Sequence, residues 1–328
     1  MTDRAQLIVR LRHWPAEWMA YLRSRRFRHI LEYIGFRIFY GLLKAIPLEL
    51  CAPLLARGCR AFSSRSFRHR RALANLEKAF PVKSLEQRDA IALAMWDNVG
   101  RVLAEAVHLD RFLAEPHRLD MLEMSILDGY KTEHGLYIAV SLHTGNWELG
   151  LLPSALRGYD PAAIYRVVAN PLVDRFIRAS RAKIYSGGLF AMRDSSGGLT
   201  PVESASRELV RCLRRGGVVG IVADYHDPKG IEIPFLGQTI RVSKVPATLA
   251  YQFKGRICVA RAVRLGHSSR FLADAHALKL PQTGDRHADI EALTLAIFRQ
   301  FEAWIRQFPE QWLWSQAPFV LSSEVARS

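Results

Sequence analysis

Nearly apolar runs of strand length alternate with helical segments from about residue 136 to the end of the chain. Such runs are typical of strands buried on both faces of a sheet, and their alternation with helices indicates a layered α/β fold. The strand-like runs span residues 136–142, 217–223, 257–265 and 271–278. The helical segments begin near residue 147 and span 202–215 and 288–308. The sequence therefore predicts a single α/β domain with a mixed sheet.

The N-terminal part of the chain is strongly basic. Residues 1–71 contain 15 Lys or Arg against 4 Asp or Glu, which places +11 of the formal net charge of +15 in this part. Large apolar and aromatic residues, among them Trp14, Trp18 and Tyr21, alternate with these charges. A basic helix with aromatic residues on its other face is typical of the headgroup region of a membrane. An amphipathic helix that packs on its own domain has the same pattern, so both interpretations stay open.

Residues 30–56 form the most hydrophobic stretch of the chain. A membrane-spanning helix needs about 20 consecutive apolar residues. The stretch is interrupted before that length is reached, by Glu32, Arg37, Lys44, Pro47 and Glu49. We therefore expect a helix over about 30–45 that lies shallowly in the membrane interface or lines an apolar groove, with a tilted single span as the alternative.

These patterns divide the chain into membrane-associated N-terminal helices over 1–70, an α/β domain over 71–320 and a short tail over 321–328. Near the start of the domain, Ser84 is followed three residues later by Gln87, a spacing that resembles a capping box. It predicts a helix over about 85–108.

The cysteines and glycine-rich segments carry no sign of a bound group. The four cysteines, at positions 51, 59, 212 and 258, have no paired short spacing, and no cleavable signal sequence opens the chain. We expect them to be small buried hydrophobes of a protein in a reducing, cytoplasm-facing location. The glycine pairs at 187–188 and 197–198 lack the lysine and spacing of a phosphate-binding loop. The sequence predicts no cofactor and no metal.

The segment Ser-Leu-His-Thr-Gly-Asn-Trp-Glu over 141–148 lies where a predicted buried strand ends and a helix begins. Polar residues at the carboxyl end of a parallel strand are usually part of a site. On one continuous helix His143 and Glu148 would point roughly 140° apart. They meet if His143 lies on the turn and Glu148 in the first helical turn, and Gly145 supplies the backbone freedom for that turn.

In that geometry a carboxylate holds one imidazole nitrogen while the other takes a proton from an attacking hydroxyl. Free amides at the helix start would steady a developing oxyanion, so the predicted chemistry is direct group transfer. The alternative is that His143 is a structural residue at a strand end, with its hydrogen bonds satisfied, and that Glu148 is an acidic residue at a helix start. Metal binding is not expected, because the spacing differs from HExxH and no second ligand stands nearby.

The sequence HTGNWE is similar to the HxxxxD/E motif of the lysophospholipid acyltransferase superfamily. Further segments resemble, in order, its lipid A biosynthesis branch, the late lauroyl and myristoyl acyltransferases of Gram-negative inner membranes. These segments are 165–174 (YRVVANPLVD), the strand ending at Asp224, 233–237 (IPFLG) and 309–314 (PEQWLW). The resemblance covers about residues 30 to 318 and implies an α/β acyltransferase domain with an N-terminal helical extension.

By this resemblance, His143 removes the proton from the acceptor hydroxyl, typically one on a β-hydroxyacyl chain of the disaccharide. Glu148 orients the imidazole and balances its charge. The resemblance places substrate contacts at Gly145, Asn146, Arg166, Asn170, Asp174, Asp224, Pro234, Phe235 and Gly237.

Several of these residues have more than one interpretation. Arg166 either holds a phosphate of the acceptor with its guanidinium fork or is a surface arginine. Asn170 and Asp174 either contact substrate or only tie their loop together. Asp224 is expected to line the cleft, but Tyr225 stands where the family pattern has glutamine, which leaves the substrate contacts there open.

The later segments are expected to shape the site. Pro234, Phe235 and Gly237 are predicted to form a tight apolar turn in the groove wall. Trp312 and Trp314 are expected to pack in the core or at an interface.

The resemblance also implies the substrates and the location. The expected donor is an acyl group on acyl carrier protein, with a coenzyme A thioester as the alternative, and the expected acceptor is a glycolipid precursor of lipid A. The expected location is the cytoplasmic face of the inner membrane. A phospholipid or another glycolipid as acceptor, or a basic membrane- or nucleic-acid-binding scaffold without catalysis, are the alternatives. No nucleic acid is expected, because the sequence has no helix-turn-helix, RNP aromatic pair or zinc spacing.

Overall fold

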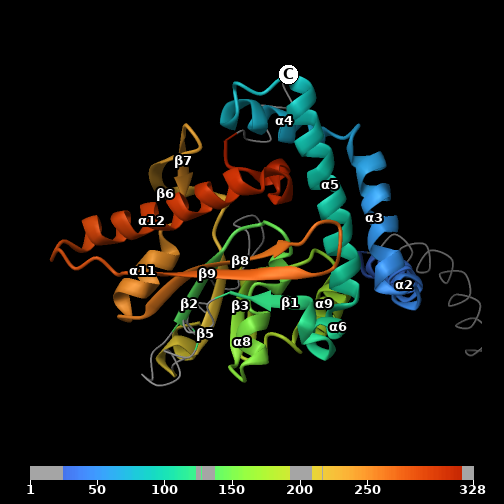
Figure 1. Ribbon diagram of the computed structural model, residues 1–328. Coiled ribbons are helices and arrows are strands. Elements are labelled where there is room, and N and C mark those ends of the chain that lie inside the picture. Colours follow the sequence, from blue (N-terminus) through green and yellow to red (C-terminus); the bar gives the residue numbers. More distant parts are fainter. Residues whose placement is uncertain (1–24, 123–126, 128–136, 193–208, 216, 320–328) are drawn as a thin grey trace, which may run out of the picture.

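The computed structural model describes residues 25–122, 127, 137–192, 209–215 and 217–319. A seven-stranded sheet with the order β1-β9-β8-β2-β5-β3-β4 forms its centre (Figure 1). The strands are β1 (Leu119–Met121), β2 (Tyr137–Ser141), β3 (Pro161–Arg166), β4 (Gly188–Met192), β5 (Val218–Val222), β8 (Arg256–Arg264) and β9 (Phe271–Leu278). Strands β8, β2, β5, β3 and β4 run parallel, whereas β9 is antiparallel to β8 and parallel to β1. The predicted α/β fold with a mixed sheet is confirmed.

The four strands predicted from apolar runs are present as β2, β5, β8 and β9. The short strands β3 and β4 were not expected, because β3 begins with Pro-Ala-Ala and β4 begins at the second of two glycines, which hides the apolar pattern. The predicted helix over 288–308 is α12 (Arg286–Gln307). Of the helix predicted over 202–215, residues 209–214 are helical and the earlier ones lie outside the described residues.

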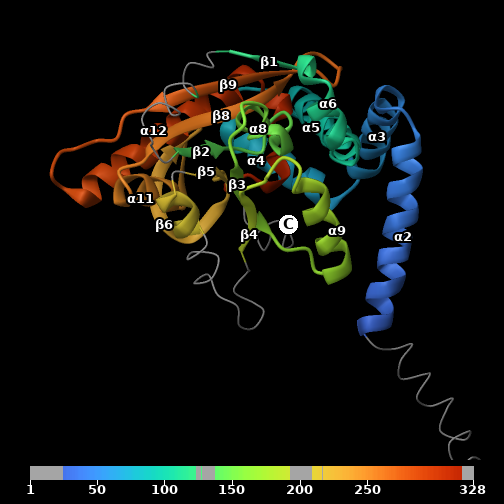
Figure 2. The ribbon, with the colours of Figure 1, turned by 90° about the horizontal axis from the view of Figure 1, so that it is seen from below.

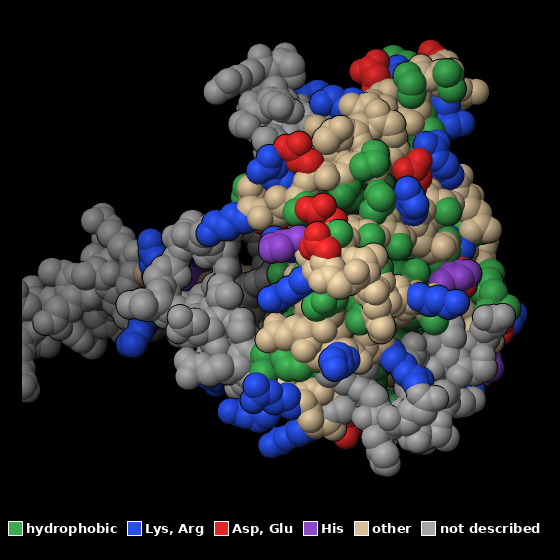
Figure 3. All heavy atoms as spheres, turned by 90° about the vertical axis from the view of Figure 1, so that its left-hand side faces the viewer, with side chains coloured by type: hydrophobic (Ala, Val, Ile, Leu, Met, Phe, Trp, Pro, Cys, Tyr) green, Lys and Arg blue, Asp and Glu red, His purple; other side chains and the backbone are tan. Residues whose placement is uncertain are grey.

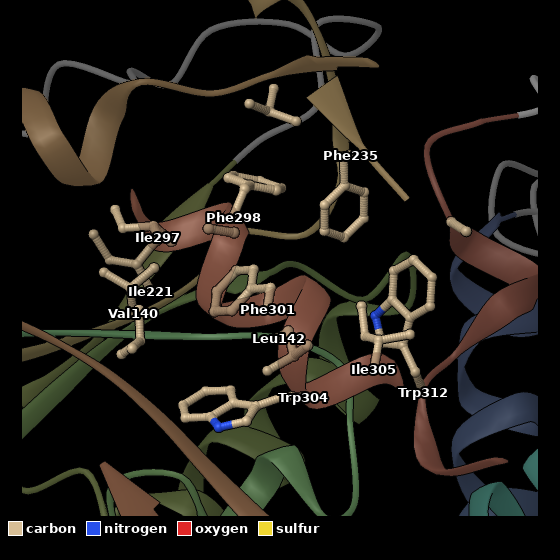
Figure 4. Close-up of a cluster of buried hydrophobic side chains, with 14 of the residues drawn as sticks. Val140, Leu142, Ile221, Phe235, Ile297, Phe298, Phe301, Trp304, Ile305 and Trp312 are labelled. Carbon is tan, nitrogen blue, oxygen red and sulfur yellow. The ribbon is translucent and has the colours of Figure 1, made fainter. Parts of the chain in front are cut away.

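Side chains of β2 alternate between two hydrophobic clusters, one on each face of the sheet. Ile138, Val140 and Leu142 belong to the cluster that α12 covers, and Tyr137 and Ala139 belong to the other. Figure 4 shows the first cluster, in which Val140, Leu142 and Ile221 face aromatic and aliphatic side chains of α12. This two-sided burial is why β2 reads as a continuous apolar run.

The helices pack around this sheet and beside it (Figure 1). They include α2 (Arg25–Ala45), α3 (Leu48–Ser63), α4 (Phe67–Ala79), α5 (Leu85–Val107), α6 (Leu109–Ala114), α8 (Leu152–Leu156), α9 (Pro171–Arg181) and α11 (Val245–Gln252). The capping box predicted for α5 is present, because Ser84 Oγ accepts from the Gln87 amide at 3.3 Å and Gln87 Oε1 from the Ser84 amide at 3.0 Å. Helix α3 lies against α5 where Gly100 leaves no Cβ, since a Cβ there would come within 2.3 Å of Leu55 O.

Strands β6 (His226–Phe235) and β7 (Gln238–Val242) form a separate antiparallel hairpin. Its two turn residues, Leu236 and Gly237, have φ angles of 51° and 76°, the left-handed pair of a type I′ turn. The predicted tight turn is present at Gly237, whereas Pro234 and Phe235 are paired residues of β6. Phe235 itself is buried and packs on Phe298 and Trp312 with ring centroids 5.4 and 6.0 Å apart, so it lies in the core and does not line an open groove.

Helix α2 confirms the expected helix over 30–45 and the N-terminal helical region. Figure 2 shows it along the side of the molecule next to α9. One face packs on α9, where the ring centroids of Phe36 and Tyr40 lie 5.6 and 4.8 Å from that of Phe176. The other face leaves large apolar side chains exposed: Ile30, Leu31, Ile34, Ile38, Phe39 and Leu42. Among the helices that the structure describes, none combines the length and apolarity needed to cross a membrane. Trp14, Trp18 and Tyr21 lie outside the described residues.

Candidate active site

The site lies at the carboxyl edge of the parallel strands β2 and β5. Ser141 pairs with Val222 in register, and each strand ends at that pair. His143 and Asp224 each follow two residues later, and the amide of Ala223 donates to Ser141 O at 2.9 Å. The parallel register therefore brings together two polar side chains that are 81 residues apart in the sequence.

The carboxylate of Asp224 accepts three hydrogen bonds, two from His143 and one from Trp312. Its Oδ1 accepts from His143 Nδ1 at 2.8 Å, and its Oδ2 accepts from the backbone amide of His143 at 2.8 Å and from Trp312 Nε1 at 2.7 Å. The Asp224 side chain is only 2% exposed. Because a carboxylate accepts the Nδ1 hydrogen, the neutral imidazole carries its lone pair on Nε2.

The pair shifts the ionisation of both partners. Burial by itself raises the pKa of Asp224, but the charge of His143 and the hydrogen bonds from its ring, from Trp312 and from the His143 amide lower it below the ordinary value. Burial by itself lowers the pKa of His143, but the charge and hydrogen bond of Asp224, with the charge of Glu148, raise it above 6.5. The site therefore strengthens His143 as a base and stabilises the imidazolium that forms when it takes a proton.

The imidazole of His143 is partly exposed. The side chain is 26% exposed, and its ring meets the Trp147 ring edge-on with centroids 5.4 Å apart. Among the residues that the structure describes, His143 Nε2 has no hydrogen-bond partner. A hydroxyl placed there would donate its proton to Nε2.

Glu148 does not hold the imidazole. Its carboxylate forms an ion pair with Arg181 of α9, and its backbone carbonyl accepts from the Tyr185 hydroxyl at 3.1 Å. The chain after His143 enters a short 3₁₀ helix, Trp147–Leu149, which directs Glu148 toward α9. The expectation that Glu148 orients His143 is therefore corrected in favour of Asp224. Glu148 acts on His143 through its charge, and its role in catalysis stays a prediction.

Gly145 and Asn146 shape the loop between His143 and Glu148. Gly145 has a φ of +54°, and a Cβ there would lie 1.9 Å from Ala262 O, so both the conformation and the space require glycine. Asn146 is fully buried, and its Oδ1 accepts from the Glu148 amide at 3.0 Å, which caps the 3₁₀ helix. The turn predicted at Gly145 is confirmed. The polar atoms of both residues are used within the protein, and their contact with substrate stays a prediction.

Most backbone amides of this loop already donate hydrogen bonds within the protein. The amides of Thr144, Gly145 and Asn146 donate to the carbonyls of Leu142, Gln311 and Ala262 at 2.8, 3.1 and 3.0 Å. Those of His143 and Glu148 donate to side chains. The expected stabilisation of an oxyanion by free amides is therefore corrected for these five positions.

The segment after α12 completes the site. Trp312 pairs with Thr144 in an isolated antiparallel bridge, and the amide of Leu313 donates to His143 O at 2.9 Å. Trp312 and Trp314 are buried, and their ring centroids lie 4.6 Å apart, as expected for core packing. The indole bond from Trp312 to Asp224 was not expected, although a buried indole N–H generally requires an acceptor.

The profile of one protein family, described as bacterial lipid A biosynthesis acyltransferase, matches residues 22–319. The chain belongs to this family. The match includes all of the site and the α2 helix, and it makes the protein an acyltransferase of lipid A biosynthesis. None of the curated proteins matches the chain closely enough to count as a relative.

Three further residues that the resemblance assigned to substrate, Arg166, Asn170 and Asp174, lie in α9 of this acyltransferase or just before it. Asn170 caps α9, since its Oδ1 accepts from the Leu172 amide at 3.0 Å, and its Nδ2 donates to His29 O on α2 at 2.8 Å. Asp174 accepts from the Val168 amide at 2.9 Å and the Tyr165 hydroxyl at 3.1 Å. Of the two interpretations, these contacts favour residues that tie the loop together. Arg166 ends β3, and its side chain lies outside the described part.

A cavity of about 560 Å³, open to solvent, lies between α9 and the start of β4. Arg175 and Arg178 line it, as does Tyr185, which also contacts Glu148. Within the part of the chain that the structure describes, no cluster of His, Cys, Asp or Glu could hold a metal ion. The cavity thus places two arginines, together with Asp174, next to Tyr185, a partner of Glu148.

We predict that Asp224→Asn lowers kcat/KM far more than Glu148→Gln does. Oδ2 of Asp224 serves two fixed donors, so an amide oxygen takes that place and the NH₂ group faces Nδ1. Nε2 would then carry the hydrogen and could not act as the base, a loss of roughly 10² to 10⁴. Glu148→Gln removes only a charge. Besides kcat/KM, the pH–rate profile is measured for the native protein and the variants.

Activity of the native acyltransferase should rise with pH through a midpoint above 6.5, because the neutral imidazole is the base and its pKa is raised. Glu148→Gln should move that midpoint down, since one of the charges that raises the pKa is lost. An equal loss of kcat/KM in both variants, or a larger loss in Glu148→Gln, contradicts the assignment of Asp224.

Proposed function

We propose that this acyltransferase moves a fatty acyl chain from a thioester donor to a hydroxyl of a lipid A precursor, with His143 as general base. The observation that carries the proposal is the His143–Asp224 pair, in which the imidazole is partly exposed and Nε2 has no hydrogen-bond partner among the described residues. The hydroxyl proton passes to Nε2 as the oxygen attacks the thioester carbonyl carbon. The C–O bond forms, the C–S bond breaks, and the leaving thiolate takes the proton back from the imidazolium.

The cysteines support direct transfer without an acyl-enzyme intermediate. Burial raises the pKa of all four thiols, and that of Cys258 reaches about 12. A thiol with a raised pKa is a poor nucleophile near neutral pH. The base at His143 and a hydroxyl acceptor are then sufficient for the reaction.

The proposed donor is an acyl group on acyl carrier protein. This carrier is an acidic protein, and the chain carries a formal charge of +15. Figure 3 shows Lys and Arg side chains spread over one face, with fewer acidic side chains among them. A coenzyme A thioester is also anionic, so direct comparison of the two donors is required.

The proposed acceptor is a phosphorylated glycolipid. The cavity beside α9 supports it, because Arg175 and Arg178 line the cavity and neither has an ion-pair partner among the described residues. Guanidinium groups bind phosphate in bidentate geometry. The same activity assay with a dephosphorylated acceptor tests this assignment, which predicts a higher KM.

The direct test is acyl transfer by the purified full chain, followed by mass spectrometry of the glycolipid. We predict that the native protein adds one acyl chain, that acyl carrier protein is the better donor, and that His143→Ala lowers the rate roughly 10² to 10⁴-fold. His287→Ala is the control, because that histidine is exposed on α12. A folded His143→Ala variant with native activity would contradict His143 as the general base, and a native protein that transfers no acyl chain would favour the non-catalytic scaffold.

We also propose that α2 attaches the protein to the cytoplasmic face of the inner membrane. Its outward face exposes Leu31, Ile38 and Leu42 by 53%, 60% and 62%, and Leu50 and Leu54 of α3 are likewise exposed. Contiguous exposed apolar side chains of this size are typical of a membrane or protein contact, and the basic N-terminal charge favours an anionic lipid surface.

The position of α2 supports this attachment. Its inner face packs on Phe176 of α9, and α9 carries Arg181, the ion-pair partner of Glu148. A helix lying in the headgroup region would therefore hold the site close to a lipid acceptor.

We predict that Ile38→Glu weakens binding of the full chain to vesicles containing phosphatidylglycerol by about tenfold or more, because a charge enters the apolar face. Val82→Glu is the matched control, since Val82 is also an exposed apolar residue but lies between α4 and α5. Sedimentation with vesicles at two salt concentrations measures both variants. Equal binding by the two variants contradicts attachment through α2.

A further inference from the structure

A buried ion pair lies behind the His143 loop. Glu105 of α5 is fully buried, and the Arg264 side chain at the end of β8 is 3% exposed. Arg264 Nη2 donates to Glu105 Oε2 at 2.8 Å, and Arg264 Nη1 also contacts the carboxylate. Ser269 Oγ donates to Glu105 Oε1 at 2.7 Å, and Asn146 Nδ2 donates to Oε2 at 2.9 Å. Glu105 thus links Arg264 directly to the loop.

A second connection runs from the same guanidinium to the neighbouring loop residue. Arg264 Nε donates to Asn98 Oδ1 at 2.8 Å, and Asn98 Nδ2 donates to Gly145 O at 2.8 Å. Asn98 and Glu105 are seven residues apart on α5, which places them on one face, two turns apart. One arginine therefore reaches both Gly145 and Asn146, each through one side chain of α5.

Removing the two charges of an ion pair from water has a high free-energy cost. Well-packed apolar side chains in their place often stabilise a fold as well or better. Here Glu105 accepts one further hydrogen bond from Asn146, and Arg264 donates one to Asn98, which in turn holds Gly145. Their other hydrogen bonds join Ser268 and Ser269 of the turn between β8 and β9. That pattern fits a fixed backbone geometry better than it fits stability alone.

We propose that Arg264 and Glu105 are positioning residues for acyl transfer, which fix Gly145–Asn146 and thereby hold His143 against Asp224. The inference rests on the proposed function, because the geometry it explains is that of the general base. A misplacement of about 1 Å at a reacting group costs roughly 10²-fold in rate.

The same strand supplies a matched control. Arg261 precedes Arg264 by three residues on β8 and is also buried. It donates to Asp274 at 3.1 Å and to Gln307 at 2.7 Å, and its guanidinium lies 4.7 Å from the Trp304 ring centroid. These partners belong to β9 and α12, and among the described residues none of them forms a hydrogen bond with the His143 loop.

The experiment compares Arg264→Lys with Arg261→Lys in the full chain. Each lysine keeps the positive charge but loses the planar fork, so a single ammonium at 264 cannot serve Asn98 and Glu105 in the same geometry. We expect kcat to fall roughly 10- to 100-fold in Arg264→Lys with KM within about twofold, and to stay within about twofold of native in Arg261→Lys. The midpoint of thermal unfolding, Tm, should fall by similar amounts in both variants.

A second measurement separates positioning from stability. The charged groups that act on His143 are Asp224 and Glu148, and Arg181 pairs with Glu148. If the loop loosens, the contact with Asp224 weakens, and the NMR titration midpoint of His143 should fall in Arg264→Lys but not in Arg261→Lys. Asn98→Ala, which cuts one connection and keeps the ion pair, should shift both kcat and the midpoint in the same direction by a smaller amount.

The outcomes are distinct. If Arg264→Lys and Asn98→Ala keep native kcat and the native His143 midpoint, or if Arg261→Lys loses as much kcat as Arg264→Lys, the positioning role is overturned. If Arg264→Lys does not fold, Asn98→Ala decides on the same two measurements. If the native chain transfers no acyl group, the proposed function fails, whereas the His143 titration still reports whether the ion pair positions the loop.

Discussion

The buried carboxylate of Asp224 is the interaction on which the site depends. A carboxylate that is almost fully removed from water is costly unless several donors compensate it. Here the donors are the ring and amide of His143, which follows β2, and the indole of Trp312, which lies in the segment after α12. The same compensation joins three distant parts of the chain, raises the pKa of His143 and fixes its tautomer. Fold and chemistry therefore rest on one set of hydrogen bonds.

The surroundings of this carboxylate are built in two directions. Behind the loop, α5 and β8 hold the backbone at Gly145 and Asn146 through buried polar side chains. On the other side, Glu148 joins the loop to α9, and α9 joins it to the exposed apolar face of α2. The site is thus attached to a rigid interior and to the element that we propose meets the membrane, which suits an enzyme whose acceptor is a lipid.

Local patterns predicted the fold well where packing and pattern agree. The two-sided burial of β2 and β5 makes their sequences continuously apolar, and the capping box marked the start of α5, so these elements were predictable. β3 and β4 were not, because short strands with Pro, Gly and Ala at their starts have little apolar signal. Family resemblance, and not periodicity, pointed to the reaction.

The site itself was only half predictable. The turn at Gly145 and the place of His143 just after a buried strand follow from the local motif. The partner of His143 does not, because Asp224 is contributed by a neighbouring strand, and pairing across a parallel sheet depends on a register that no local pattern contains. Glu148, five residues away, was the natural expectation, yet the 3₁₀ helix directs it to Arg181. The role of the polar side chains of α5 was not predicted either, because their spacing is that of any helix face.

The ¹⁵N NMR spectrum of the imidazole of His143, in the full chain labelled at histidine and assigned by comparison with His143→Ala, tests the central claim most directly. The account predicts a neutral ring protonated at Nδ1 and free at Nε2, with a titration midpoint above 6.5. A neutral ring protonated at Nε2, or a midpoint at or below 6.5, would contradict the assignment of Asp224 as the group that makes His143 the base.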